Sequence, residues 1–160
     1  MSHNGYQPSH GLTHGRILTL SVDGRTLEGE DILTTLDDAD NAIFDQAVAN
    51  FGPEGMPYAV RFHLHPDVAA TLDNSGRGVT LRLKSGEVWL LRHDGPAKLS
   101  LSGSVYLQNG RLKPRPTQQV VLSGNAMAYA TRVRWSLAKA SDTPQATRDL
   151  EQADPMDIVD

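Results

Sequence analysis

The sequence predicts an all-β fold, an antiparallel β-sandwich of jelly-roll-like form. Short segments of alternating apolar and polar residues recur along the chain, and turn residues separate them. The 160 residues are 39% hydrophobic, which is enough for one packed core. These observations favour a single domain built from two packed sheets.

The N-terminal part predicts a β-hairpin. Residues 12–22 form an extended run with apolar positions, Asp23-Gly24 follows at once, and residues 25–33 supply the partner strand. Asp-Gly is typical of two-residue turns in which both central residues have positive φ.

The middle of the chain interrupts this pattern before the strands return. Residues 34–57 have apolar residues near helical spacing and predict a short helix or an ordered acidic loop. Further strands are predicted, with glycine- or proline-containing turns between several of them, at residues 58–65, 78–84, 87–93, 98–108, 117–124 and 128–138. We therefore place one domain at residues 1–139, with 34–57 as an acidic insertion.

The last segment, residues 140–160, has few large apolar residues and predicts a disordered acidic tail. Charge is uneven along the chain, because residues 23–57 hold nine acidic residues against one arginine and residues 58–141 hold twelve basic against four acidic. The net charge of −4 is therefore a poor guide to any one surface.

Composition also excludes several classes. We expect no membrane partner, because no apolar stretch approaches the roughly 20 residues of a spanning helix, and the N-terminus lacks signal-peptide features. We expect no nucleic-acid partner, because aromatic residues make up only 6% of the chain. The chain has no cysteine, so it has neither disulfides nor thiolate ligands, and its compartment stays open.

A candidate metal site lies in RFHLHP, residues 61–66. In an extended strand His63 and His65 would share one face, which is a known way to present two imidazoles to zinc. A third ligand is not evident, and a solvated strand face is the alternative reading.

Two further groups of residues suggest chemistry. Tyr6 and His14, near the N-terminus, are candidates for proton transfer, with ordinary surface positions as the alternative. Arg132 and Arg134 alternate on one predicted strand, and Arg115 lies beside a turn, so these arginines could bind carboxylates or sulfates of an acidic polysaccharide. A solvated sheet face would look the same.

The ordered series of motifs resembles the C-terminal region of bacterial heparinase II/III-like proteins from about residue 3 to 139. The motifs that carry the resemblance are HNGY at 3–6, GLTHGRILTLSVDGRTLEGED at 11–31, RFHLHPDV at 61–68, SGEVWLLRHDG at 85–95, SVYL at 104–107, PRPTQQVVLSG at 114–124 and RVRWSL at 132–137.

The resemblance implies a β-sandwich that in whole family members follows a helical α/α-toroid and completes a polysaccharide lyase. Such carbon–oxygen lyases cleave heparin- or heparan-like acidic glycans, or other uronate-containing ones, by β-elimination, with tyrosine and histidine as base and acid. Some members hold a structural zinc, for which a histidine of the RFHLHP segment is a candidate ligand. The resemblance also makes the periplasm or the cell envelope a candidate compartment for this chain.

The 160 residues contain no counterpart of the toroid. We therefore expect this chain to be inactive alone and to support a toroid supplied elsewhere, as a fragment or as part of a split lyase. The alternatives are a non-catalytic module that binds acidic carbohydrate and a plain interaction domain.

Overall fold

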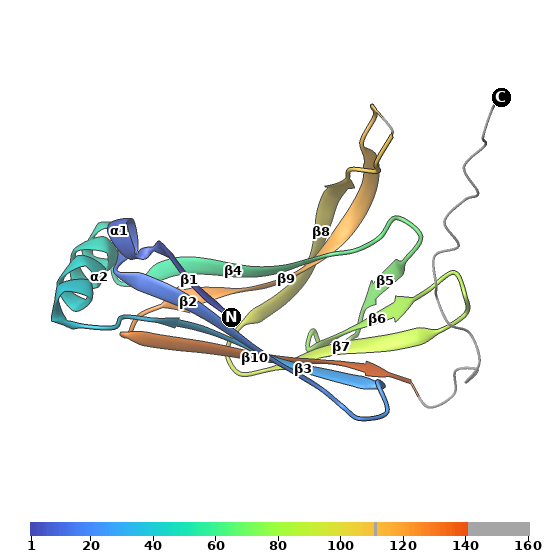
Figure 1. The fold of residues 1–160 in the computed structure, drawn as a ribbon, viewed down its shortest axis with the longest axis horizontal. Helices are drawn as coiled ribbons and strands as arrows, with labels where there is room; N and C mark the ends of the chain where they lie inside the picture. The colour runs from blue at the N-terminus through green and yellow to red at the C-terminus, as the bar shows by residue number, and fades with distance from the viewer. Residues whose placement is uncertain (111, 141–160) are drawn as a thin grey trace.

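The computed structural model describes residues 1–110 and 112–140 as two antiparallel β-sheets that face each other (Figure 1). The larger sheet has the order β1 (Ser2–Tyr6), β2 (Leu12–Leu20), β3 (Thr26–Thr34), β10 (Ala130–Lys139), β7 (Val88–Asp94), β6 (Gly78–Arg82) and β5 (Ala69–Leu72). The smaller sheet has the order β4 (Met56–His63), β9 (Arg115–Ala126) and β8 (Lys98–Tyr106). The predicted antiparallel sandwich is thus confirmed, whereas the predicted tail lies outside the described residues, apart from Ala140.

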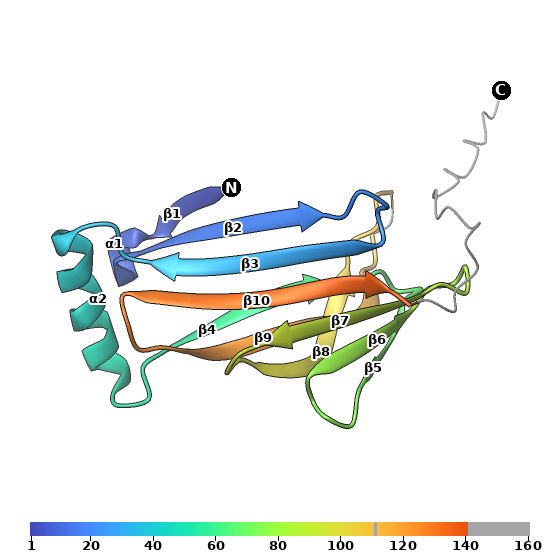
Figure 2. The same ribbon diagram turned by 90° about the horizontal axis from the view of Figure 1, so that it is seen from below.

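Two helices close one end of the sandwich (Figure 2). α1 (Gln7–His10) joins β1 to β2, and α2 (Asp38–Phe51) joins β3 to β4. The helix alternative for residues 34–57 is therefore confirmed. Asp37 caps α2 by accepting a hydrogen bond from the Asp40 backbone N–H at 2.9 Å, and the helix buries Phe44 and Ala47 against the sheets. None of the described helices is both long enough and apolar enough to cross a membrane.

The predicted N-terminal hairpin is confirmed as a pairing of β2 with β3, but the predicted two-residue turn is wrong. The loop runs from residue 21 to 25, and only Gly24 in it has positive φ, at 67°. The Asp23 carboxylate accepts hydrogen bonds from the Ser21 hydroxyl and the Arg25 backbone N–H, which favours a wider loop. These hydrogen bonds also hold the pKa of Asp23 below its usual value.

Two short strands escaped prediction. β1 has five residues, all exposed, and β5 has four. Neither is long enough to display a clear alternation of apolar and polar residues, so periodicity carries no signal there.

The main core lies between the two sheets. Val120 and Leu122 of β9 are fully buried and pack with Val79 of β6 and Val133 of β10. A second, smaller cluster lies beneath the helices, where Leu12, Phe44, Met56 and Ala126 are buried. The two clusters fix how the sheets and the helical end are placed relative to each other.

The position of Trp135 in this core depends on a glycine. A Cβ atom added to Gly29 of β3 would lie 2.1 Å from Cζ2 of Trp135, so the indole occupies the space that a side chain would need. Trp135 also packs edge-on against Phe62 of β4, with ring centroids 4.8 Å apart. The missing side chain at Gly29 therefore allows the indole to join the two sheets.

We expect Gly29→Ala to lower the free energy of unfolding by about 1–3 kcal/mol, because the new methyl group would displace a packed indole. Urea unfolding followed by tryptophan fluorescence measures the change. Gly15→Ala on β2 is the matched control, since a Cβ there meets nothing within 4 Å. Equal effects of the two substitutions would contradict this account of Gly29.

Candidate functional site

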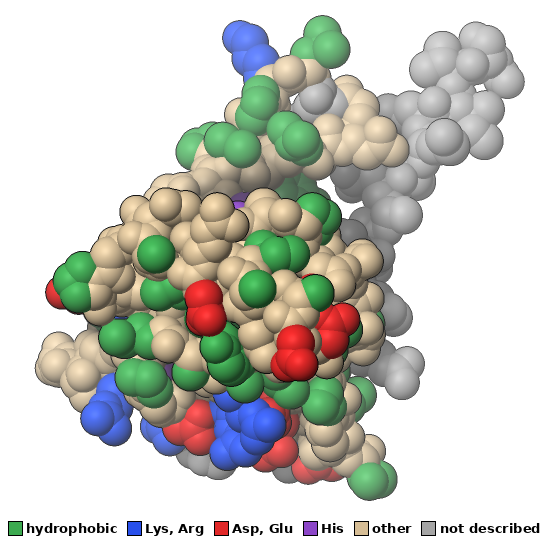
Figure 3. Space-filling model, turned by 90° about the vertical axis from the view of Figure 1, so that its left-hand side faces the viewer, with side chains coloured by type: hydrophobic (Ala, Val, Ile, Leu, Met, Phe, Trp, Pro, Cys, Tyr) green, Lys and Arg blue, Asp and Glu red, His purple; other side chains and the backbone are tan. Residues whose placement is uncertain are grey.

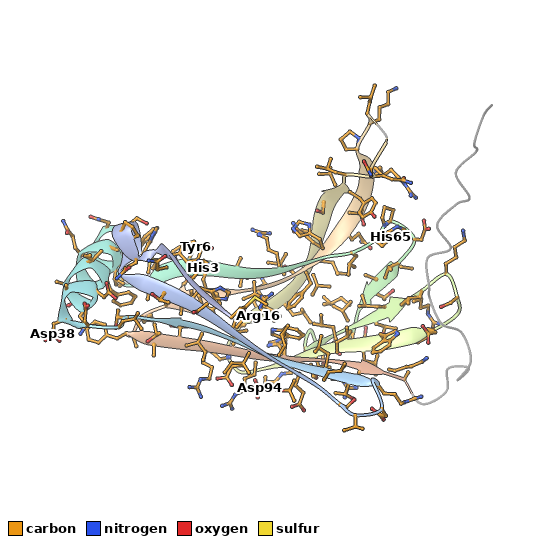
Figure 4. The ribbon with its side chains drawn as sticks, in the orientation of Figure 1. His3, Tyr6, Arg16, Asp38, His65 and Asp94 are labelled. Atoms are coloured by element: carbon orange, nitrogen blue, oxygen red, sulfur yellow. The ribbon has the colours of Figure 1, made fainter. Side chains whose placement is uncertain are left out.

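A pocket of about 390 Å³ lies at one side of the sandwich, between the inner face of the larger sheet and the small sheet. We call it the inner-face pocket; Figure 4 labels His3, Tyr6 and Arg16 in this region. Its lining residues are His3, Tyr6, His10, Leu12, His14, Arg16, Asp31, Leu33, residues 56–61, Ala126, Thr131 and Val133. Strands β1, β2, β3, β4, β9 and β10 together with α1 therefore supply its walls.

The carboxylate of Asp31 organises the base of this pocket. Asp31 is 2% exposed, and its Oδ1 accepts hydrogen bonds from Arg16 Nε and His14 Nε2, each at 2.7 Å. Its Oδ2 accepts a hydrogen bond from Trp135 Nε1 at 2.9 Å. Strands β2, β3 and β10 thus contribute to one polar cluster.

Burial by itself would raise the pKa of Asp31, because desolvation disfavours the charged form. Hydrogen bonds from Arg16, Trp135 and His14, together with the Arg16 charge, outweigh burial and hold the pKa of Asp31 below its usual value. The carboxylate is therefore ionised at neutral pH.

Arg16 is held by more than the ion pair. Its Cζ lies 5.9 Å from the Phe62 ring centroid and 6.0 Å from that of Trp135, so the guanidinium contacts aromatic rings from both sheets. The charge of Arg16 is neutralised by Asp31, and its position is fixed.

The hydrogen bonds around His3 and His14 assign the proton positions of both imidazoles. The Gly5 backbone N–H donates to His3 Nδ1 at 3.2 Å, so the His3 proton lies on Nε2. His3 Nε2 then donates to His14 Nδ1 at 3.2 Å, and His14 Nε2 donates to Asp31. The Gly5 backbone and the Asp31 carboxylate thus hold both rings in one hydrogen-bonded chain.

Hydroxyl groups complete the pocket. Tyr6 is 48% exposed, and its ring lies between those of His3 and His10, with centroids 5.3 Å and 6.5 Å away. Burial raises the pKa of Tyr58, so this phenol stays protonated at neutral pH.

The structure brings together the two residues predicted for proton transfer, since Tyr6 and His14 both line the inner-face pocket. Sequence reasoning missed Asp31, which looked like one more acidic residue of an acidic block, and it missed Arg16 and Trp135. No local spacing signals this cluster, because Trp135 is 104 positions from Asp31.

The predicted pair His63 and His65 lies elsewhere, and Figure 4 shows His65 beside the β8–β9 hairpin, away from His3 and Tyr6. β4 ends at His63, so the prediction of one strand carrying both residues is wrong. His63 Nδ1 lies 2.8 Å from the Ser104 hydroxyl, while His65 packs on the Tyr106 ring with centroids 4.9 Å apart. His65 leaves the ladder because the chain turns at Pro66 and Asp67.

No group of three or more histidines, cysteines or carboxylates is placed to hold a metal ion within the described parts of the chain, residues 1–110 and 112–140. The ligand set of these residues thus does not fit the structural zinc that the resemblance implies. Zinc binding by His63 or His65 stays a prediction.

The three predicted substrate-binding arginines do not form one surface. Arg132 and Arg134 share the outer face of the larger sheet, where their Nε atoms lie 2.6 Å and 3.6 Å from the Glu30 carboxylate. Arg115 lies on the small sheet and pairs with Asp67 at 3.1 Å. Each arginine therefore faces a carboxylate of the same chain.

The end of the molecule that carries the helices shows a different surface. Figure 3 shows acidic and apolar side chains scattered over this end, with basic side chains gathered at its lower edge. The acidic block of the sequence thus forms part of a mixed surface in the fold.

Comparison with known protein families bears on the identity of this sandwich. Residues 1–136 match the family model for the heparinase II/III-like C-terminal domain. The chain belongs to this heparinase II/III-like C-terminal family.

A curated relative, "FtsZ-localized protein C" of Caulobacter vibrioides, is 34% identical over 139 residues. The match covers 86% of this chain and 22% of that protein. The chain thus spans about a fifth of the length of this relative.

Replacing Asp31 by asparagine removes the charge that Arg16 and His14 share. We expect Asp31→Asn to lower the free energy of unfolding at pH 7 by about 2–3 kcal/mol, less than for a fully buried pair because Arg16 is partly exposed. Because the folded-state pKa is lowered, this stabilisation is present above the unfolded pKa of about 3.9 and is lost as pH falls through the folded value.

Urea unfolding across a pH series measures this difference, and the gap between wild type and variant should close below about pH 4. Asp94→Asn, an exposed carboxylate on β7, is the control for loss of a charge and should change stability little. If the difference in free energy of unfolding between wild type and Asp31→Asn stays the same at acidic pH, the Asp31 charge is not its cause.

Proposed function

We propose that this domain forms one wall of an acidic-glycan cleft, centred on the inner-face pocket, in a heparinase II/III-like polysaccharide lyase. The observation that carries the proposal is the convergence of Tyr6, His10 and His14 with Arg16 in one open pocket. Volumes of roughly 300–1,000 Å³ are typical of small-molecule sites, and this pocket lies within that range.

The groups of the pocket suit β-elimination. In this reaction a base removes the proton α to the uronate carboxylate, and an acid protonates the departing glycosidic oxygen. Tyr6 is open to solvent and is the residue best placed to exchange a proton with a bound sugar. His14 is locked between His3 and Asp31, so its role would be to orient the histidine pair.

Turnover would need groups from outside this domain. The proposal rests on the family resemblance, and in whole family members a helical toroid supplies most of the cleft. For this domain the toroid would lie either on the same polypeptide or on a separate chain. This chain spans 22% of its curated relative, so the proposal assigns it substrate contact and support of a toroid.

The alternative is a non-catalytic module that binds acidic carbohydrate through Arg132 and Arg134. Their ion pairs with Glu30 weaken this alternative, because the carboxylate offsets their positive charge. The inner-face pocket is favoured because its imidazole and phenol groups converge and offer hydrogen bonds to a sugar.

Titration of the chain with a uronate-containing oligosaccharide, followed by NMR chemical shifts, tests the two sites against each other. Tyr6→Ala should weaken binding about tenfold through the loss of one hydrogen bond and its ring contact. Arg134→Ala is the matched control, because its side chain is 54% exposed and Tyr6 is 48% exposed, and it should change affinity less than about twofold. The chain alone should release no unsaturated uronate, read by ultraviolet absorbance.

If Arg134→Ala weakens binding more than Tyr6→Ala does, and if salt abolishes binding, the outer arginine face is favoured instead. Rapid release of unsaturated product by the chain alone would contradict the need for a toroid. No binding by any variant or by wild type would remove both carbohydrate proposals.

A second candidate function is association with FtsZ. The supporting observation is the 34% identity to a protein whose name states that it is FtsZ-localized, over 86% of this chain. On this proposal the domain contributes to recruitment to FtsZ polymers, and glycan contact is absent or accessory.

Co-sedimentation with polymerised FtsZ tests this candidate directly. We expect the chain to enter the pellet with FtsZ polymers and to stay in the supernatant when FtsZ is kept unpolymerised. Bovine serum albumin added to the same samples controls for trapping. A chain that stays in the supernatant with polymers would place FtsZ association in the parts of the relative that this chain does not match.

A further inference from the structure

The β8–β9 hairpin rises clear of the rest of the sandwich (Figure 1). Three large apolar side chains on this arm are exposed: Val105 by 62%, Leu107 by 77% and Leu112 by 102%. Exposed apolar residues gathered on one projecting element are typical of an interaction surface.

The arm also carries a sheet edge that belongs to no second described ladder, with β5 of the larger sheet close to part of β8. Four strands form the edges of the two described sheets: β1, β4, β5 and β8. β1 is short and irregular in register, β5 has four residues, and β4 carries Pro57 and Arg61. Short length, proline, charge and bulges are the usual means by which proteins block pairing at edges.

β8 has none of these features beyond its first residue. It runs for nine residues, KLSLSGSVY, with one charge at Lys98 and no proline. Within the described residues it pairs only with β9, so its other edge is not part of a ladder. Among the four edges, β8 is thus the one suited to accept another strand.

The β8 sequence is complementary to itself. In an antiparallel pairing centred on Gly103, Leu101 lies opposite Val105 of the second strand, and Ser102 lies opposite Ser104. Lys98 lies opposite Gln108, so no charge meets a like charge. The exposed Val105 would gain an apolar neighbour.

We propose that a second copy of this chain docks on the edge of β8, through a two-fold axis at Gly103. The two three-stranded sheets then form one continuous six-stranded sheet. The interface buries the apolar arm and satisfies the backbone groups of the edge. This dimer does not depend on any ligand of the inner-face pocket.

Gly103 allows a sharp test, because a Cβ there meets nothing within 4 Å in the single chain and the residue is exposed. Gly103→Glu should therefore leave the fold intact and place two carboxylates against each other on the axis. Sedimentation velocity over a concentration series should show a dimer for wild type and at least about a tenfold weaker dimer for Gly103→Glu.

Charge complementation separates this interface from others. Gly103→Lys alone should also be weakened, and an equimolar mixture of Gly103→Glu and Gly103→Lys should recover the dimer, since opposite charges then meet. Leu36→Glu, which changes a 66% exposed leucine near α2, is the control and should dimerise like wild type. Circular dichroism confirms that each variant is folded.

Hydrogen exchange of the backbone amides of residues 99–105 gives a second readout, and their protection should rise with protein concentration. A wild type that is monomeric up to about 1 mM would overturn the proposal. So would a dimer that tolerates Gly103→Glu, or one that Leu36→Glu disrupts equally. If the chain stays monomeric and instead binds unrelated extended peptides along β8, the proposal that a second copy occupies this edge is wrong.

Discussion

The carboxylate of Asp31 is the constraint on which the inner face of this sandwich depends. An ionised group that is 2% exposed is tolerated only when donors replace its water shell, and here three side chains do so. These donors come from β2 and β10, so the carboxylate fixes both neighbours of β3. Arg16 extends the cluster to the second sheet through the Phe62 ring.

This cluster also explains why a pocket forms where it does. The larger sheet has seven strands and the smaller has three, so the smaller sheet cannot cover the whole inner face. The uncovered part includes β1 and β2, where polar side chains such as His3 and His14 point inward. Because Asp31 holds His14 in place, these side chains form a walled pocket rather than a mobile surface.

The alternation of apolar and polar residues was enough to predict the sandwich, because each strand buries one face. The pairing of β2 with β3 followed from the Asp-Gly turn, although Asp23 changes the form of that turn through its own hydrogen bonds. Strands β1 and β5 are too short for a period to appear. The alternation of apolar and polar residues therefore predicts long strands better than short ones.

The candidate site was less predictable for a different reason. His63 and His65 attracted attention because they are close in sequence, yet one contacts Ser104 and the other Tyr106. The residues that do converge, His3, His14 and Asp31, are brought together by strand pairing, which spacing along the chain does not reveal. The resemblance identified the family, but the geometry was needed to find the pocket.

The fold also changes the meaning of the charge pattern. The acidic block supplies Glu30 and Asp31, and these carboxylates pair with Arg132, Arg134 and Arg16 from other parts of the chain. Part of the apparent charge asymmetry is therefore cancelled inside one molecule. A polyanion drawn by bulk charge would find little excess positive potential at these pairs. Under the proposed function, glycan recognition at the inner-face pocket would therefore depend on directional hydrogen bonds of its imidazole and phenol groups rather than on bulk charge.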